Sequence, residues 1–289
     1  MRPKYPDDFA AFILTNGRPN NVLTYETLRK SGYSGRIFLL IDDLDPTLAG
    51  YWDRFREEEI VIFDKMASRL SFDTADNFDD MRAICYARNS TFAAAERLGI
   101  PYFIQLDDDY RDFQYRFDQD FRYLPKTLKN LDRVFSALLD FFFDSGADSI
   151  AIAQGGDFIG GEDSTWAQKI FLRRKCMNSF FCSVGRKFPF VGRINEDVNT
   201  YTNSGSRGRL FFTTNQVNLN QLRTQSNPGG MSGLYLDSGT YVKSFYSVIF
   251  QPSSVSISLL RDRLEPRIHH SVSWRHTVPM ILREEIRKI

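Results

Sequence analysis

The chain has 289 residues, of which 42% are hydrophobic and 25% are charged, and its formal net charge is +1. This composition excludes a disordered, collagen-like or coiled-coil protein, and the length suits one large α/β domain with its own core. The three cysteines form no complete disulfide framework, so we expect a reducing, cytoplasmic environment. No apolar run is as long as a membrane helix requires, and the first residues carry acidic side chains where a signal peptide would be apolar. We therefore expect neither export nor membrane contact.

Charge is unevenly distributed along the chain. Residues 1–110 hold 13 Lys and Arg against 19 Asp and Glu, whereas residues 111–289 hold 24 against 17. The second part, with a net charge of +7, is the better candidate for contact with a polyanion. Chance segregation of solvated surface charge would give the same counts.

The first third of the chain alternates between apolar runs and helical patterns. The apolar runs Phe9–Thr15, Gly35–Asp43 and Glu59–Lys65 predict strands, and the stretches between them, Asn21–Lys30 and Thr47–Glu58, predict helices. Continuous apolar strands separated by helices favour a mainly parallel sheet with helices on its faces.

The same pattern continues through the middle of the chain. A helix is predicted over Phe78–Leu98, a strand over Tyr102–Asp109 and a core-facing helix over Pro125–Asp144. The strand predicted at Ser149–Gln154 runs into a loop, residues 155–161, in which four glycines allow close approach of the backbone.

The regular pattern weakens in the last third. Residues Asn199–Gly233 are rich in Asn, Ser, Gly, Thr and Gln, with one short strand expected at Leu210–Thr214, and the basic tail Leu259–Ile289 carries all three histidines. We therefore expect an irregular region on one side of the sheet. No repeat or convincing linker divides the chain.

Three adjacent carboxylates, Asp107, Asp108 and Asp109, close the fourth predicted strand. They repel one another, so their clustering favours a bound cation, and ligands of open α/β sheets bind at the carboxyl ends of strands. Because side chains alternate along a strand, we expect Asp107 and Asp109 to share Mg²⁺ or Mn²⁺, which would also bind a substrate diphosphate. A solvated acidic turn is the structural alternative. The P-loop pattern and a dinucleotide fingerprint after the first strand are both missing from the sequence.

A series of motifs in this order resembles a known family. Thr15-Asn16-Gly17-Arg18 after a strand, Asp42-Asp43 at the end of the next, Ala87-Arg88-Asn89 on a helix and then the aspartate triplet are similar to a GT-A glycosyltransferase with its Asp-x-Asp metal motif. The segments SIAIAQGGDFIGG and GRINEDVNTY, with a late HHSVSW, more specifically resemble the TET-associated glycosyltransferases of bacteriophages. The likeness covers roughly Phe9 to Pro279. The Asp-x-Asp part is generic, whereas the joint pattern of the other segments is more specific.

The resemblance implies a GT-A-type, Rossmann-like sheet in a single domain over residues 1–289, with a donor half over 1–110 and an acceptor half over 111–289. It implies transfer of a sugar, with glucose expected, from a UDP-sugar to the hydroxyl of a 5-hydroxymethylpyrimidine, such as 5-hydroxymethylcytosine, in the DNA of a phage inside its bacterial host. A GT-A enzyme for a polysaccharide, lipid or protein hydroxyl stays open, as does an inactive sugar- or nucleic-acid-binding module. The oligomeric state also stays open.

A second acidic pair, Glu196 and Asp197, lies in the segment RINEDVN. Glycosyl transfer with inversion needs a carboxylate that accepts the proton of the attacking hydroxyl, and the first acidic cluster would be occupied by metal. By resemblance to the Glu-Asp motif of inverting GT-A enzymes, Asp197 is the expected base, with Glu196 as an acceptor-orienting group or alternative base. A capping pair on a loop is the structural alternative.

The resemblance also assigns binding residues. In GT-A enzymes a C-terminal histidine often completes the metal shell, which points to His270 or its neighbour His269 and favours Mn²⁺, although both could lie in a surface tail. Arg18 and Arg88 could bind a uracil edge or the diphosphate, or form structural salt bridges, and Asp42 or Asp43 could accept the uracil imide N–H. The expected donor-side residues are Thr15, Asn16, Arg18, Asp42, Asp43, Arg88, Asn89, Asp107 and Asp108. The expected acceptor-side residues are Gln154, Gly155, Gly156, Asp157 and Asn195.

Basic clusters among aromatic residues are compatible with contact to a DNA backbone. The clusters are Arg173-Arg174-Lys175, Arg186-Lys187 and Arg207-Gly208-Arg209, and the aromatic residues include Phe171, Phe180 and Phe181. Solvated surface charge is the alternative. A base in a duplex must leave the stack to reach a pocket, and the sequence does not identify the residue that would displace it.

Overall fold

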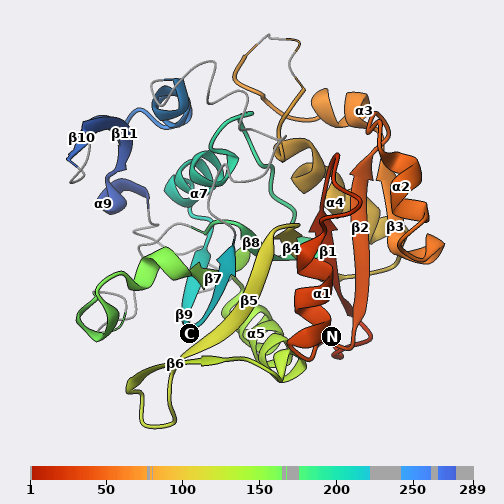
Figure 1. Cartoon of the computed structure of the whole chain (residues 1–289). Coiled ribbons are helices and arrows are strands. Elements are labelled where there is room, and N and C mark those ends of the chain that lie inside the picture. The colour runs from red at the N-terminus through yellow and green to blue at the C-terminus, as the bar shows by residue number, and fades with distance from the viewer. Residues whose placement is uncertain are drawn as a thin grey trace.

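One nine-stranded sheet organises the computed structural model, which describes residues 2–76, 79, 81–164, 167, 176–221, 242–261 and 266–277 (Figure 1). Its strand order is β3-β2-β1-β4-β8-β7-β9-β5-β6. The strands are β1 (Phe9–Leu14), β2 (Arg36–Asp42), β3 (Ile60–Phe63), β4 (Tyr102–Asp107), β5 (Tyr110–Phe117), β6 (Tyr123–Thr127), β7 (Ser149–Gln154), β8 (Ser179–Ser183) and β9 (Phe211–Gln221).

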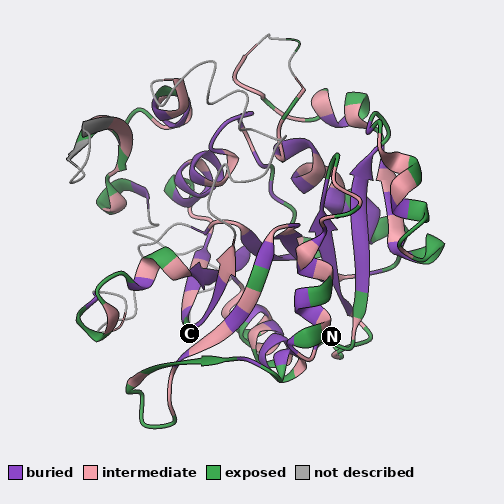
Figure 2. Cartoon of the chain, in the orientation of Figure 1, coloured by how far each residue is buried: buried purple, intermediate pink, exposed green. Residues whose placement is uncertain are grey.

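Helices cover both faces of this sheet. The helices of this main part are α1 (Leu23–Lys30), α2 (Leu48–Trp52), α3 (Lys65–Arg69), α4 (Cys85–Arg97), α5 (Leu131–Ser145) and α7 (Glu196–Ser206), whereas α9 (Trp274–Thr277) belongs to a C-terminal segment and contacts α7. Because side chains alternate along a strand, Phe9 and Ile13 of β1 join the core with α1 and α5, whereas Phe12 joins the core with α4 and α7. Every residue of β1 is therefore buried (Figure 2). The predicted α/β sheet flanked by helices is confirmed.

The direction of the strands defines where a ligand site can lie. Strand β1 is parallel to β2 and β4, and β2 is parallel to β3, as predicted for the first third of the chain. Strand β8 is antiparallel to both β4 and β7, so β7 runs in the same direction as β4. The rest of the sheet is mixed, since β7 is parallel to β9, whereas β5 is antiparallel to β9 and β6. The carboxyl ends of β1, β2, β4 and β7 thus share one edge, where open α/β sheets bind ligands.

Several predicted helices are shorter than expected. The helix predicted over Thr47–Glu58 ends at Trp52, and a 3-10 turn follows at Glu57–Glu59. The helix predicted from Pro125 begins at Leu131, because Pro125 lies in the edge strand β6, where a missing N–H is tolerated. The helix predicted from Phe78 begins at Cys85, and Phe78 itself lies outside the described residues.

The sequence patterns missed strands β5, β6 and β8 and helix α7. Helix α7 reads EDVNTYTNSGS, which contains few good helix formers, and it is stabilised by packing of the buried Val198 and Tyr201 on the sheet. Strand β9 extends to Gln221, well past the predicted Leu210–Thr214. The described part of the expected irregular region, residues 199–221, is therefore mostly regular.

A C-terminal segment, residues 242–261 and 266–277, packs beside α7 (Figure 1). It consists of a helix over residues 242–250, the antiparallel hairpin of β10 (Val255–Arg261) and β11 (Pro266–Val272), and α9. The ring of Trp274 stacks on Tyr201 of α7 with centroids 5.4 Å apart. Within the described part of the chain, no helix is long and apolar enough to cross a membrane.

Candidate active site

The buried guanidinium of Arg88 connects the two acidic motifs. Its Nη2 donates to Asp107 Oδ1 at 3.0 Å, and its Nε donates to Glu196 Oε1 at 3.0 Å. Asp107 is the last residue of β4, and Glu196 is the first residue of α7. Only 1% of the Arg88 side chain is exposed. One cation therefore places the end of the fourth strand against the start of α7.

Aromatic rings and backbone hold Arg88 in this position. Its guanidinium carbon lies 4.9 Å from the ring centroid of Phe180 and 5.7 Å from that of Phe190. Gln105 Nε2 donates to the Arg88 carbonyl at 2.9 Å. Burial alone would lower the pKa of Arg88, but the charges of Asp107 and Glu196 raise it above its ordinary value. Of the two roles predicted for Arg88, the structure therefore shows the salt bridge.

Only the first residue of the aspartate triplet belongs to strand β4, and the other two form a turn. Strand β4 ends at Asp107, and β5 begins at Tyr110, so Asp108 and Asp109 form the connection between two strands. Thr24 supports this turn, since its Oγ1 donates to the Asp107 carbonyl at 2.6 Å and its N–H donates to the Asp108 carbonyl at 3.1 Å. The expectation that strand alternation orients Asp107 and Asp109 alike is therefore wrong in its premise. Their sharing of a metal ion stays a prediction.

The three carboxylates lie in different surroundings. Asp108 is buried and accepts from Thr15 Oγ1 at 2.7 Å and from Arg18 Nη1 at 3.0 Å. Among the described residues, Asp109 forms no ion pair. Burial raises the pKa of Asp108 to about 6, with Arg18 opposing the shift. Burial, followed by the charges of Asp107 and Asp108, raises the pKa of Asp109 to about 7.

This donor set fits a hard divalent cation. No group of three His, Cys, Asp or Glu side chains within the described ranges is arranged to hold a metal. Mg²⁺ is nevertheless commonly bound by only one or two carboxylates, with substrate phosphates and water as the other ligands. Asp109, whose charge is opposed by two neighbouring carboxylates, is the member of the triplet that a cation would stabilise most.

Two of the predicted donor-side residues, Thr15 and Arg18, lie just after β1 and contact the aspartate triplet. Thr15 and Arg18 contact Asp108, and Thr15 Oγ1 lies 3.0 Å from Tyr51 Oη. The buried Arg18 Nε has no hydrogen-bond partner among the described residues. Arg18 therefore keeps one unsatisfied donor near the carboxyl ends of β1 and β4.

A second polar group lies at the ends of β2 and β3. Asp42 Oδ2 accepts from Asn16 Nδ2 at 2.6 Å and from Lys65 Nζ at 3.1 Å. Asp42 Oδ1 accepts from the N–H of Leu44 at 3.1 Å. Asp43 is exposed, and its Oδ1 accepts from the backbone N–H of Lys65 at 2.9 Å. Sequence reasoning missed Lys65, although Lys65 closes the third predicted strand, Glu59–Lys65, and a position at a strand end is the signal that singled out Asp42 and Asp107.

Asn89 has a structural position. Its Nδ2 donates to the carbonyls of Phe190 and Cys85 at 2.9 and 3.0 Å, and its Oδ1 accepts from the N–H of Phe190 at 2.8 Å. Both ends of the amide are thus bonded to backbone. This side chain therefore anchors the Phe190 segment to α4, and a donor-binding role for Asn89 stays a prediction.

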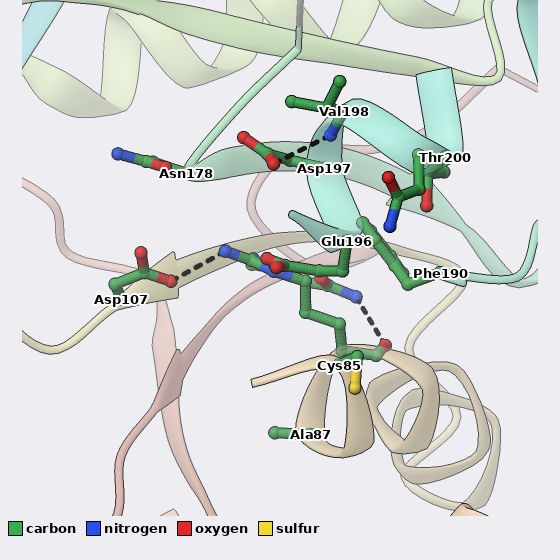
Figure 3. A network of polar contacts seen from close by, with 12 residues as sticks. Cys85, Ala87, Asp107, Asn178, Phe190, Glu196, Asp197, Val198 and Thr200 are labelled. Carbon is green, nitrogen blue, oxygen red and sulfur yellow. Dashed lines mark hydrogen bonds and ion pairs between the residues drawn. The ribbon is translucent and has the colours of Figure 1, made fainter. Parts of the chain in front are cut away.

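The two carboxylates at the start of α7 differ in their partners: Glu196 forms an ion pair, and Asp197 accepts one backbone hydrogen bond. Glu196 pairs with Arg88, and 13% of its side chain is exposed. Burial raises the pKa of Glu196 to about 7 against the opposing charge of Arg88, and the charge of Asp197 adds to the rise. Asp197 Oδ1 accepts only from the adjacent N–H of Val198, at 2.7 Å, among the described contacts (Figure 3). The other carboxylate oxygen of Asp197, Oδ2, is therefore available to accept a hydrogen bond or a proton from another group.

The predicted histidines lie beside the start of α7. His270 Nδ1 is 3.5 Å from Asn195 Nδ2, and His269 Nδ1 is 2.6 Å from the His270 carbonyl. The structure therefore brings His270 to the residue that precedes Glu196. A metal-binding role for either histidine stays a prediction.

The acceptor-side loop follows β7 at the same edge of the sheet. The N–H of Gln154 donates to Asp157 Oδ2 at 2.9 Å, which closes a 3-10 turn over Gly155–Phe158. The buried Gln154 Nε2 has no partner among the described residues. A Cβ on Gly155 would clash with Asn220 Oδ1, whereas one on Gly156 would meet no atom. The close approach expected from the glycines is therefore seen at Gly155.

The basic clusters predicted to contact DNA are largely paired within the protein or lie outside the described residues. Arg186 stacks on Phe142 with its guanidinium carbon 4.3 Å from the ring centroid, and Lys187 pairs with Glu96 at 2.5 Å. Arg209 pairs with Asp148 at 3.2 Å. Phe180 and Phe181 are core residues of β8, so the expectation that they flank a nucleic-acid surface is wrong. Arg173, Arg174, Lys175 and Phe171 fall outside the described residues.

The fold and this edge of the sheet define an α/β enzyme whose acidic side chains converge at the carboxyl ends of parallel strands. The family model named TET-Associated Glycosyltransferase matches residues 9–230. The chain belongs to the TET-Associated Glycosyltransferase family and is a glycosyltransferase. The resemblance seen in the sequence motifs is confirmed.

Similarities to other proteins are more distant. No curated protein matches the chain. A mannosyltransferase from Pyrobaculum calidifontis in complex with GDP-Man and Mn²⁺ is 11% identical, with a TM-score of 0.46, over 78% of this chain and 59% of that one. The chain thus spans less than two thirds of that protein. Glucosyl-3-phosphoglycerate synthase from Mycobacterium tuberculosis, in complex with Mg²⁺ and UDP, is 10% identical, with a TM-score of 0.47, over 91% of this chain and 87% of that one.

Proposed function

We propose that this glycosyltransferase moves a sugar, with glucose expected, from a UDP-sugar to the hydroxyl of a 5-hydroxymethylpyrimidine in DNA, with inversion and with a divalent metal. The observation that carries the proposal is the pairing of Arg88 with both Asp107 and Glu196. It joins an acidic strand end, suited to a metal and a diphosphate, to an acidic helix start, suited to proton abstraction. Transfer of a glycosyl group requires both functions within one substrate length.

Residues 1–110 are proposed as the donor half. Asp107 and Asp109 would hold Mn²⁺ or Mg²⁺, with His270 or His269 as a further candidate ligand. A bound divalent ion would stabilise the negative charge that develops on the departing diphosphate. Arg18, whose buried Nε has no hydrogen-bond partner among the described residues, would donate from its guanidinium to a phosphate oxygen, a partner that suits the guanidinium geometry.

Uracil recognition is proposed at the ends of β2 and β3. Asn16, Asp42 and Lys65 form one hydrogen-bonded group there, and the exposed Asp43 lies beside it. Because both oxygens of Asp42 already accept hydrogen bonds, Asp43 is the more open acceptor for an imide N–H. Thr15 supports the diphosphate side of the same half through its bond to Asp108.

Asp197 is proposed as the base that takes the proton from the attacking hydroxyl. An alcohol is a poor nucleophile at neutral pH, so a carboxylate with an open oxygen must accept its proton in the transition state. Asp197 has such an oxygen, whereas Glu196 shares its charge with Arg88. Glu196 would orient the acceptor or, as the alternative, act as the base.

Residues 111–289 are proposed as the acceptor half. Family membership and the net charge of +7 in this part support a DNA acceptor. Gln154, Gly155, Gly156 and Asp157 are its proposed contacts, whereas the buried amide of Asn195, also expected on this side, is bonded to Lys243 and Ser247. The buried Gln154 Nε2, which has no hydrogen-bond partner among the described residues, is the observation that favours this side. The setting would be the cytoplasm of a phage-infected bacterium.

Mass spectrometry of nucleosides tests the acceptor directly. DNA containing 5-hydroxymethylcytosine, 5-hydroxymethyluracil or only unmodified bases would be incubated with the protein, Mn²⁺ and each of several UDP-sugars. A nucleoside that gains one hexose only in hydroxymethylated DNA supports the proposal. UDP release with a polysaccharide, lipid or protein acceptor and none with DNA would establish the alternative transferase, and binding without turnover would indicate an inactive module.

A further inference from the structure

We propose that Asn195 is a positioning residue through which the C-terminal segment holds Glu196 and Asp197 in their working orientation. The C-terminal segment, residues 242–261 and 266–277, lies beyond residues 9–230 that the family model matches. The inference rests on the proposed function, because it assigns a role in that reaction to a residue next to the acidic pair.

Asn195 has a left-handed backbone conformation. Its φ is +56° and its ψ is +38°, in the left-handed region that residues other than glycine rarely adopt. It is the N-cap residue of α7, and its carbonyl accepts the first helical hydrogen bond, from the N–H of Asn199 at 2.9 Å. Strained residues of this kind persist only where the surrounding structure fixes them, and they concentrate at functional sites.

The fixing contacts come from the C-terminal segment. Asn195 Nδ2 donates to the carbonyl of Lys243 at 2.7 Å and to Ser247 Oγ at 3.2 Å, and both partners belong to the helix over residues 242–250. His270 Nδ1 of β11 lies 3.5 Å from the same nitrogen. Only 7% of Asn195 is exposed. Two C-terminal elements therefore converge on the amide of the residue that precedes Glu196.

The C-terminal segment also contacts the residues that precede Asn195 and the Asp76 side chain bonded to them. The hydroxyl of Tyr246 donates to Asp76, whose Oδ2 also accepts from Arg193 Nε at 3.0 Å. Gly192 has a positive φ of +81°, and a Cβ there would clash with the ring of Phe250 and the amide of Asn199. Residues 192–193 therefore pack between residues 73–76 and the helix over residues 242–250.

The acidic pair is therefore held from two sides. Arg88 fixes Glu196 from the sheet side, and Asn195 fixes the backbone entering α7 from the C-terminal side. A displacement of about 1 Å at a catalytic group can lower a rate by about a hundredfold. Loss of the Asn195 amide should consequently reduce turnover more than it reduces donor affinity.

Three variants separate positioning from folding. Asn195→Gly keeps access to the left-handed conformation but removes the amide. Ser247→Ala removes one acceptor of that amide. Asn203→Ala is the matched control, because Asn203 Nδ2 donates from α7 to the Phe250 carbonyl at 3.3 Å, on the same C-terminal helix but away from the acidic pair. For each, kcat, the donor KM and the melting temperature would be measured with the acceptor on which the wild type is active.

We expect Asn195→Gly to lower kcat by about tenfold or more with the donor KM within a few-fold of wild type. Ser247→Ala should give a smaller loss in the same direction, and Asn203→Ala should leave kcat unchanged. A kcat for Asn195→Gly within twofold of wild type, or an equal loss in Asn203→Ala, would overturn the inference. A wild type without turnover on any acceptor would instead reject the proposed function. Asn195→Gly protein that still binds UDP and melts as the wild type does shows that its loss is not unfolding.

Discussion

Arg88 and Glu196 are 108 residues apart in the sequence, yet Arg88 Nε lies 3.0 Å from Glu196 Oε1 in a largely buried ion pair. The same guanidinium pairs with Asp107 at the end of β4. Helix α4, strand β4 and helix α7 therefore meet at one side chain. Because a buried cation with two anionic partners has few alternative positions, this contact sets the distance between the acidic strand end and the acidic helix start.

Removing the guanidinium should destabilise the fold. Arg88→Met would leave Asp107 and Glu196 without their cation, and loss of one partner of a buried ion pair typically costs about 3–5 kcal/mol. Urea denaturation followed by circular dichroism measures the loss. Arg2→Met is the control, since Arg2 pairs with Asp140 and Asp144 on the surface, where such pairs contribute about 0–1 kcal/mol. Similar effects of the two substitutions would contradict the prediction.

The two acidic residues of α7 should differ in kinetics. Asp197→Asn should lower kcat by about a hundredfold or more, which is the usual loss when a general base is removed, with the donor KM nearly unchanged. Glu196→Gln should retain more activity if it only orients the acceptor. Steady-state rates of UDP release measure both. An inactive Glu196→Gln beside an Asp197→Asn within a few-fold of wild type would assign the base to Glu196.

Asp109→Asn should abolish metal-dependent UDP binding while the fold is retained. The substitution removes the carboxylate whose charge is opposed by Asp107 and Asp108, so the apo protein should be no less stable. Calorimetric titration with UDP, with and without Mn²⁺, checks this. Asp112→Asn serves as the control, because Asp112 is bonded to Asn220 and Gln114 outside the triplet. Wild-type turnover in EDTA would remove the metal from the proposal.

Stability should depend on pH through Glu196. Burial raises the folded-state pKa of Glu196 from 4.5 to about 7, so between these values the folded state keeps a proton that the unfolded state has released. The contribution of this proton to stability is complete below the unfolded pKa and is lost as pH rises through the folded one. The wild type should lose stability relative to Glu196→Gln between about pH 5 and pH 7, by at most about 1.4 kcal/mol per pH unit. Parallel profiles of unfolding free energy against pH for the two proteins would rule this out.

Substitution of the two adjacent glycines after β7, Gly155 and Gly156, should affect stability differently. Gly155→Ala should destabilise the protein by about 1–3 kcal/mol, because its Cβ would clash with Asn220 Oδ1. That oxygen cannot shift easily, since it accepts from Asn218 Nδ2 at 2.9 Å while Asn220 Nδ2 donates to Asp112. Gly156→Ala meets open space and should be nearly neutral. Thermal denaturation of both variants measures this difference in stability. Equal melting temperatures would show that the Asn220 side chain moves to accommodate the added Cβ.

Local patterns predicted the apolar strands of the first half of the sheet and β7, because each of these strands is a run of apolar residues adjacent in the chain. Strands β1, β2, β3 and β7 are all short apolar runs, and all were expected at nearly their observed positions. Helix α7 and strand β5 were missed because polar residues dominate them and tertiary packing stabilises them. Strand alternation failed at Asp107 and Asp109 because a turn begins there, which hydrogen bonds from Thr24 of α1 support.

The sequence by itself determined the family, the α/β class and the two acidic motifs, since these are properties of residue type, order and spacing. Tertiary structure decided which side chains share the site. Arg88 could have bound a ligand or formed a salt bridge, and its burial against Phe180 and Phe190 selected the salt bridge. Asn89 was expected on the donor side, and only the tertiary structure shows that its amide is bonded to the backbone of Phe190. Such choices depend on desolvation and on partners distant in the chain, and neither is encoded in a local pattern.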